Sequence, residues 1–167
     1  MTKNGENSDS SNKSAKADNP QVRLPPPLVF GLPLFLCLYI QSNWFEGSIG
    51  PLLPFATGLS LAGAGVIAAI YEAWRHESSG SNVEPWKPTT LILTDGLYRY
   101  SRNPIYVAMV LIYSGVAIAA GSWIAFLLLP LCIFILRYHV IAREEVYLED
   151  KFGDIYLEYK ATVRRWI

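Results

Sequence analysis

Charged residues are scarce in this chain: Asp, Glu, Lys and Arg supply 17% of its 167 residues, against about 25% in an ordinary soluble domain. The 14 basic residues balance the 14 acidic ones, so no overall field attracts nucleic acid, and we expect no such partner. Cysteine is limited to Cys37 and Cys132, which lie in apolar runs without metal-ligand spacing. We therefore expect neither a metal site nor a disulfide.

Three long runs contain no Asp, Glu, Lys, Arg or His, and they predict helices that cross a membrane. Residues 24–45 and 47–71 are each long enough, because about 20 apolar residues cross roughly 30 Å of hydrocarbon. The third run, 103–136, is too long for one span and predicts a helical hairpin with arms at about 105–120 and 122–140. A single kinked helix is the alternative, but its apolar part would be about 50 Å long.

Lysine and arginine are absent from the short connections 41–50 and 121–122, whereas they occur before the first run, between the second and third, and from Arg137 onward. By the positive-inside rule, both termini and the long middle loop face the cytoplasm. The predicted fold class is all-α: a polytopic integral membrane helical bundle of about four transmembrane helices with a C-terminal amphipathic cytoplasmic helix. Residues 1–23 predict a disordered cytoplasmic tail, because their first part is polar and almost free of apolar residues.

Polar and aromatic residues gather in residues 81–106, directly before the third apolar run. Thr94-Asp95-Gly96 is a turn signal, and Pro104 suits the first turn of a helix that Asn103 or Ser101 can cap. A helix start offers free N–H groups and the positive end of the helix dipole, which suit the carboxylate of a small ligand. On residue types alone, an ordinary juxtamembrane cap with Arg and Tyr as interfacial anchors is the simpler interpretation.

After the fourth predicted span, apolar residues recur at three- and four-residue steps, which predicts an amphipathic helical tail. Gly153 followed by Asp154 predicts the boundary between two helices in this tail. Arg137 and Glu144 are seven residues apart and share a face of a regular α-helix. A carboxylate there can hold the ammonium of an amino-acid ligand, with a solvated or salt-bridged helix end as the alternative.

Three groups of residues follow one another between about residues 82 and 166. They are Thr94-Asp95-Gly96-Leu97-Tyr98, then Ser101-Arg102-Asn103-Pro104-Ile105-Tyr106, then Arg143-Glu144-Glu145 with Leu148, Phe152-Gly153, Tyr156 and Tyr159. In this order, after two predicted spans, they resemble the membrane methyltransferase superfamily that contains isoprenylcysteine carboxyl methyltransferases and phospholipid N-methyltransferases. The resemblance implies that residues 24–167 form a membrane methyltransferase-like domain.

The resemblance also implies S-adenosylmethionine as the cofactor. It would be held by the strand-like segment before the Gly-x-Tyr turn, by an Arg-x-Pro-x-Tyr loop, and by the Glu pair, chiefly its first member. The implied cofactor-binding residues are Thr90, Leu91, Ile92, Leu93, Tyr98, Arg102, Asn103, Pro104, Ile105, Tyr106, Glu144 and Glu145. Three positions depart from the family pattern: Asn103 replaces the usual His, Ala108 a frequent Gly, and Val140 an Arg that binds the acceptor carboxylate in prenylcysteine enzymes.

We therefore expect an S-adenosylmethionine-dependent methyltransferase, similar to isoprenylcysteine O-methyltransferases, that acts at the cytoplasmic membrane face. Its acceptor would be lipid-borne, prenylated or a small hydrophobic molecule, such as a prenylcysteine-like carboxylate. Arg137, Arg143 and Tyr106 are the candidate catalytic residues, and the two arginines would orient an acidic acceptor. A nicotinamide-dependent membrane reductase and a non-catalytic membrane protein that assists a partner are the two alternatives.

Overall fold

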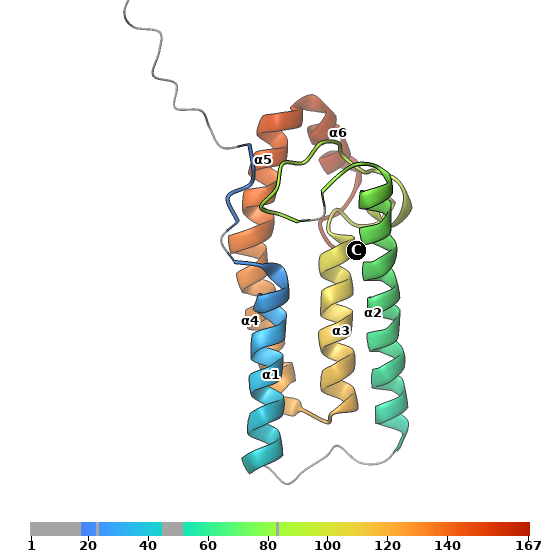
Figure 1. The fold of residues 1–167 in the computed structure, drawn as a ribbon, viewed down its shortest axis with the longest axis vertical. Helices are drawn as coiled ribbons and strands as arrows, with labels where there is room; N and C mark the ends of the chain where they lie inside the picture. The colour runs from blue at the N-terminus through green and yellow to red at the C-terminus, as the bar shows by residue number, and fades with distance from the viewer. Residues whose placement is uncertain (1–17, 23, 45–51, 83) are drawn as a thin grey trace, which may run out of the picture.

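The computed structural model describes residues 18–22, 24–44, 52–82 and 84–167, and these residues form helices and loops without any strand. The all-α prediction is thereby confirmed. The described residues form six α-helices, which Figure 1 labels, together with a 3-10 turn, η1, and a π-helical turn, η2. In chain order the elements are α1 (Pro26–Trp44), α2 (Leu52–Ser78), η1 (Gly96–Arg99), α3 (Pro104–Ala119), α4 (Trp123–Leu136), η2 (Arg137–Ile141), α5 (Ala142–Phe152) and α6 (Asp154–Thr162).

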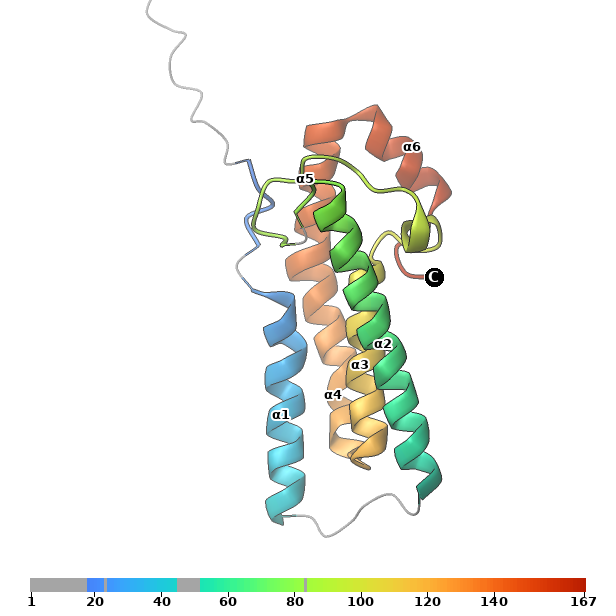
Figure 2. The same cartoon turned by 45° about the vertical axis from the view of Figure 1, so that its right-hand side comes forward.

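Four helices, α1 to α4, lie side by side and form an elongated bundle (Figures 1 and 2). The loop between α2 and α3 gathers with α5 and α6 at one end of this bundle. The turn between α3 and α4 lies at the opposite end. Polar loop residues and the charged C-terminal helices therefore share one end of the molecule.

Helices α2 and α3 pack so closely that their contact requires small residues. A Cβ atom added to Gly58 would lie 2.4 Å from the Ala119 nitrogen, and one added to Gly115 would lie 2.4 Å from the Ala62 nitrogen. Such backbone contact is a common way for helices to associate in a membrane, where burying apolar side chains gives little driving force.

The predicted helical hairpin between α3 and α4 is confirmed. Gly121 has a φ of 64°, a left-handed conformation that glycine adopts without steric cost. The Ser122 side chain then accepts a hydrogen bond from the Ala125 nitrogen and caps α4. The Tyr113 hydroxyl donates to the Ala125 carbonyl at 2.9 Å, which ties α3 to the start of α4.

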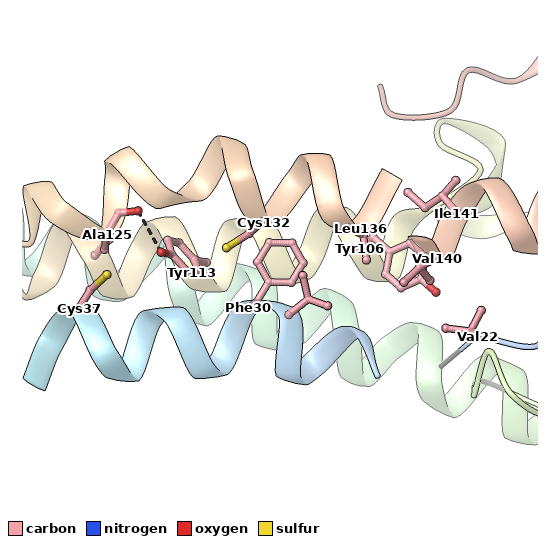
Figure 3. Close-up of a cluster of buried hydrophobic side chains, with 12 residues drawn as sticks. Val22, Phe30, Cys37, Tyr106, Tyr113, Ala125, Cys132, Leu136, Val140 and Ile141 are labelled. Carbon is pink, nitrogen blue, oxygen red and sulfur yellow. Dashed lines mark hydrogen bonds between the residues drawn. The ribbon is translucent and has the colours of Figure 1, made fainter. Parts of the chain in front are cut away.

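A buried core lies where α1, α3 and α4 meet, and Figure 3 shows its side chains. Phe30 of α1 meets Tyr113 of α3 edge to face, with ring centroids 6.0 Å apart. Cys37 and Cys132 are buried in the same cluster as free thiols. This core holds α1 against the α3–α4 hairpin.

Two helical stretches, Phe55–Ser78 and Trp123–Phe152, are long and apolar enough to cross a membrane, whereas the apolar helix Pro104–Ala119 is shorter. Large apolar side chains point outward from the bundle, such as Ile67 at 70% and Leu127 at 67% exposure. Soluble monomers rarely expose contiguous apolar surface on this scale. The chain is therefore a membrane protein.

The expectation that Arg137 and Glu144 share a helix face is wrong. The chain between them makes a π-helical turn, η2, before the regular helix resumes in α5. A π-turn contains more residues than an α-turn, so it rotates everything that follows relative to a regular helix. Arg137 is exposed as a result, whereas Val140 and Ile141 are both fully buried.

Residues 1–17 and 23, which carry most of the predicted disordered tail, lie outside the described residues. The described residues of that segment pack against α5. Val22 is buried, the Gln21 carbonyl accepts a hydrogen bond from Arg143 at 3.0 Å, and Asp18 forms an ion pair with Lys151 at 2.6 Å.

Candidate active site

A cavity opens at the end of the bundle where α5, α6 and the loop of residues 79–103 meet. It encloses about 850 Å³ of empty space, including the part that is open to solvent. Ten of the predicted cofactor-binding residues line it, from three separate parts of the sequence. They are Leu91, Ile92, Leu93, Tyr98, Arg102, Asn103, Ile105, Tyr106, Glu144 and Glu145.

The two other predicted cofactor-binding residues lie next to this lining. The Thr90 hydroxyl donates a hydrogen bond to the Gly80 carbonyl at 2.9 Å, so it joins two parts of the same loop. Pro104 is the first residue of α3, as its fixed φ predicts. The residues directly before and after each of them line the cavity: Thr89 and Leu91 for Thr90, and Asn103 and Ile105 for Pro104.

Glu144 brings a carboxylate to the cavity. It accepts a hydrogen bond from the Tyr106 hydroxyl, which reaches it from α3. Within the described residues, no lysine, arginine or histidine forms an ion pair with it. Glu144 is partly buried. Since an anion that is withdrawn from water is costly unless it is compensated, this carboxylate is suited to a cationic ligand group.

Glu145, the next residue, is occupied by the protein itself. Its side chain, 8% exposed, forms ion pairs with Arg102 at 2.9 Å and with Arg165 at 2.6 Å. Adjacent residues of a helix point in different directions, so the two carboxylates have different surroundings. Glu145 links the loop before α3 to the C-terminal segment.

Backbone carbonyl groups near the C-terminus hold the loop that leads into α3. The Arg102 amide donates to the Arg164 carbonyl at 2.9 Å, and its guanidinium donates to the Lys160 carbonyl at 2.8 Å. Asn103 is the N-cap residue of α3, as expected, but its side chain does not cap the helix. It donates instead to the Arg165 carbonyl at 2.9 Å.

A polar cluster at the end of α2 holds the turn that carries Tyr98. Arg75 donates to the Asp95 carbonyl at 3.0 Å and also pairs with the Asp95 carboxylate, whose pKa it lowers from the usual value. The fully buried Glu72 accepts from the Leu97 amide at 3.3 Å and pairs with Arg75 at 3.1 Å. Gly96 has a φ of 57° here, which confirms the predicted turn.

Tyr98 is held at both ends. Its hydroxyl lies 2.8 Å from Nε2 of His76, and its carbonyl accepts from the Tyr159 hydroxyl at 2.8 Å. Burial raises the pKa of the Tyr98 phenol far above its usual value, so the phenol stays protonated at neutral pH. Burial likewise raises the pKa of Tyr159 to about 12.

The two arginines predicted to orient an acidic acceptor are not among the residues that line this cavity. Arg137 is exposed, and its guanidinium lies 5.5 Å from the centre of the Tyr138 ring. Arg143 donates to Gln21 and lines a separate hollow between residues 18–21 and α5. Tyr106, the third predicted catalytic residue, lines the cavity beside Glu144.

Several lining residues were not part of the expected site. Leu148, Tyr156 and Tyr159 belong to the motifs that carry the resemblance, and their spacing could have placed them here. His76 and Tyr147 carry no such signal, because their partners are distant in the sequence. In the part of the chain that the structure describes, no group of three His, Cys, Asp or Glu residues could hold a metal ion.

Comparison with known proteins gives three findings. A family model described as phospholipid methyltransferase matches residues 53–155. An uncharacterized protein of Haemophilus influenzae is 41% identical over 63 residues, which are 38% of this chain and all of that protein. The protein-S-isoprenylcysteine O-methyltransferase of Schizosaccharomyces pombe is 36% identical over 73 residues, which are 44% of this chain but only 31% of that enzyme. No solved structure matches the chain.

Proposed function

The chain belongs to the phospholipid methyltransferase family, and from this membership we propose that it transfers a methyl group from S-adenosylmethionine to a lipid-borne or small hydrophobic acceptor. The observation that carries the proposal is the Glu144 carboxylate, which lines the cavity without an ion-pair partner in the described residues. A charge-assisted hydrogen bond to the ammonium of the cofactor would compensate this anion. When bound, S-adenosylmethionine supplies an activated methyl group.

The residues of the cavity fit the other parts of the cofactor. Leu91, Ile92 and Leu93 lie in a loop outside the helices, so their backbone N–H and C=O groups can pair with the edge of an adenine ring. Arg102 keeps one buried donor, Nε, without a partner in the described residues. A buried unpaired donor is unfavourable, and a carboxylate of the ligand would satisfy it.

The protein's own contribution is alignment of the reacting groups and exclusion of water. Tyr98, Tyr106 and Tyr156 line the cavity with aromatic rings. The ion pairs of Glu145 with Arg102 and Arg165 hold the loop before α3 and the C-terminal segment against α5. Holding two reacting groups in line can contribute several kcal/mol to catalysis. A dry cavity also strengthens each electrostatic contact within it.

We place α1 to α4 across the bilayer as about four spans, with the cavity and both termini on the cytoplasmic side. The cavity end of the bundle carries Arg75 in the last turn of α2, Arg99 in η1 and Arg102 in the cavity lining. The turn of residues 120–122 at the other end contains no Lys or Arg. This asymmetry is the one that the positive-inside rule associates with cytoplasmic loops. The cofactor would then enter from the cytoplasm and the acceptor from the bilayer.

A carboxylate of the prenylcysteine type and an amine are both acceptors compatible with this proposal. A carboxylate needs no general base, whereas an ammonium must lose a proton before it can attack. A nicotinamide-dependent reductase is not favoured, because the family that matches is one of methyltransferases.

The test is a binding titration of the purified protein in lipid nanodiscs with S-adenosylhomocysteine and, separately, with the reduced nicotinamide dinucleotides. We expect saturable binding of S-adenosylhomocysteine alone. Binding of a nicotinamide dinucleotide alone would support the reductase, and binding of neither would support a non-catalytic role.

A further inference from the structure

His76 is a buried histidine on the wall of the cavity, near the end of α2. It is 9% exposed and lines the same space as Glu144 and Tyr106. Its Nε2 lies 2.8 Å from the Tyr98 hydroxyl, and its Nδ1 is buried without a hydrogen-bond partner in the described residues. Neither the fold nor the proposed cofactor contacts account for a titratable group at this position.

The hydroxyl of Tyr98 connects this imidazole to the cavity. Tyr98 lines the cavity, and its hydroxyl has no hydrogen-bond partner except His76 in the described part of the chain. A neutral imidazole accepts through one nitrogen and donates through the other. With the Tyr98 hydroxyl donating to Nε2, its oxygen lone pairs are available to a donor group of a ligand.

The charges around this pair favour a basic guest over an acidic one. Arg75, beside His76 on the same helix, is paired with Glu72 and Asp95. Across the cavity, Arg102 is paired with Glu145. The other titratable groups that line the cavity are two carboxylates, Glu144 and Glu84, of which Glu84 is paired with Lys87, and four phenols, those of Tyr106, Tyr147, Tyr156 and Tyr159. With Glu144 and the Nε of Arg102 assigned to the proposed cofactor, an acceptor carboxylate would find no free cation among the described lining residues.

We propose that Tyr98 and His76 form a proton relay that takes a proton from the acceptor's nucleophilic atom, an amine nitrogen. This inference rests on the proposed methyl transfer. The ammonium passes a proton to the Tyr98 oxygen as the hydroxyl proton moves to Nε2, which leaves a neutral amine and an imidazolium. The nitrogen lone pair then bonds to the methyl carbon, and the electron pair of the broken carbon–sulfur bond stays on sulfur.

The chain offers a matched control, because its second histidine, His139, is exposed and lies outside the cavity. His76→Gln keeps an amide that can bond to Tyr98 but cannot take up a proton, and His139→Gln makes the same change elsewhere. Single-turnover methyl transfer is measured from pH 6 to 10 in nanodiscs, with a long-chain primary amine and a carboxylate of equal chain length as acceptors. Binding of S-adenosylhomocysteine is measured in parallel.

We expect amine transfer by His76→Gln to fall about 100-fold at neutral pH, the lower range for general-base catalysis, and to recover as the pH approaches the pKa of the amine. Amine transfer by His139→Gln should equal that of wild type, and both variants should bind S-adenosylhomocysteine with wild-type affinity. Amine transfer by His76→Gln within twofold of wild type, or transfer to the carboxylate alone, would overturn the relay. If the wild-type protein does not bind S-adenosylhomocysteine, the proposed function itself is refuted.

A spectroscopic readout is independent of turnover. In untagged His139→Gln protein, His76 is the only imidazole in the chain, so its nitrogen resonances can be assigned directly. We expect a hydrogen-bonded Nε2 signal that shifts in Tyr98→Phe and on addition of the amine without cofactor. A signal indifferent to both changes would contradict the relay.

Discussion

The Tyr106 hydroxyl donates a hydrogen bond to the Glu144 carboxylate and so joins the first turn of α3 to α5 at the wall of the cavity. The two residues are 38 positions apart in the sequence. The contact fixes the direction of a carboxylate that has no ion-pair partner among the described residues. In the proposed function, this contact would hold the carboxylate in place for the ammonium of the cofactor.

The adjacent carboxylates should respond differently to neutralisation. Glu144→Gln should weaken binding of S-adenosylhomocysteine at least tenfold, because a hydrogen bond between charged groups is worth about 1.5–3 kcal/mol. Glu145→Gln should leave a folded site with a smaller loss of affinity but lower the thermal midpoint, because it breaks the pairs with Arg102 and Arg165. Equal, small effects on binding would remove Glu144 as the ammonium ligand.

Gly96 and Gly80 allow a comparison of crowding at similar backbone conformations. Both have positive φ, 57° and 69°, but a Cβ on Gly96 would lie 2.3 Å from Nη1 of Arg75, whereas one on Gly80 would meet nothing within 4 Å. Gly80→Ala should cost only the left-handed conformation, about 1–2 kcal/mol. Gly96→Ala should cost more and also weaken S-adenosylhomocysteine binding, because it displaces the turn that carries Tyr98. Equal thermal midpoints and affinities for the two variants would contradict the inference that the Arg75 guanidinium leaves no room for a side chain at position 96.

Stability should fall at alkaline pH through Tyr159. Its pKa is raised by burial from 10 to about 12, and its hydroxyl donates to the Tyr98 carbonyl. The protonated phenol stabilises the fold fully below pH 10, and this contribution is lost as the pH rises through about 12. Thermal midpoints of wild type and Tyr159→Phe, measured from pH 8 to 12, should converge with rising pH. A constant difference across that range would exclude this titration as the cause.

Membrane topology can be tested with reporters. A reporter after Ile167 and one between Gly80 and Asn82 should both report the cytoplasm, because lysine and arginine are concentrated on that side. A reporter at Gly47 should report the opposite side. If the reporters at Gly47 and Gly80 report the same side of the membrane, the arrangement of four spans is ruled out.

Elements with local signals were predictable from the sequence, and contacts between distant residues were not. Gly121, Gly96 and Gly153 mark turns or helix boundaries where expected, and each has positive φ. The π-turn at Arg137–Ile141 escaped prediction, because apolar residues at three- and four-residue steps suit regular and π-distorted helices alike.

The same limit applies to the candidate site. Most of the predicted residues line one cavity because the motifs are contiguous in the sequence, as in residues 102–106, which run from the loop into the first turn of α3. The carbonyls of Arg164 and Arg165 that hold this loop are backbone groups, and backbone acceptors have no residue-type signature. His76 was missed because its partner, Tyr98, lies 22 residues away.

The last prediction concerns Arg137, which the sequence suggested as a ligand for an acidic acceptor. Arg137 is exposed and stacks on Tyr138 instead of lining the cavity. Arg137→Lys keeps a cation on a long apolar stem, which is all that an interfacial anchor requires. We therefore expect methyl transfer and S-adenosylhomocysteine affinity within twofold of wild type.

Arg102→Lys is the contrasting variant, because Arg102 bonds to Glu145 and to the Lys160 carbonyl through two guanidinium nitrogens. A lysine is a point charge and cannot reproduce that fork, so both the thermal midpoint and the affinity should fall. If Arg137→Lys lowered transfer to an acidic lipid and left cofactor affinity unchanged, its guanidinium would have to reach the acceptor. The absence of any such loss would remove Arg137 from the groups that contact the acceptor.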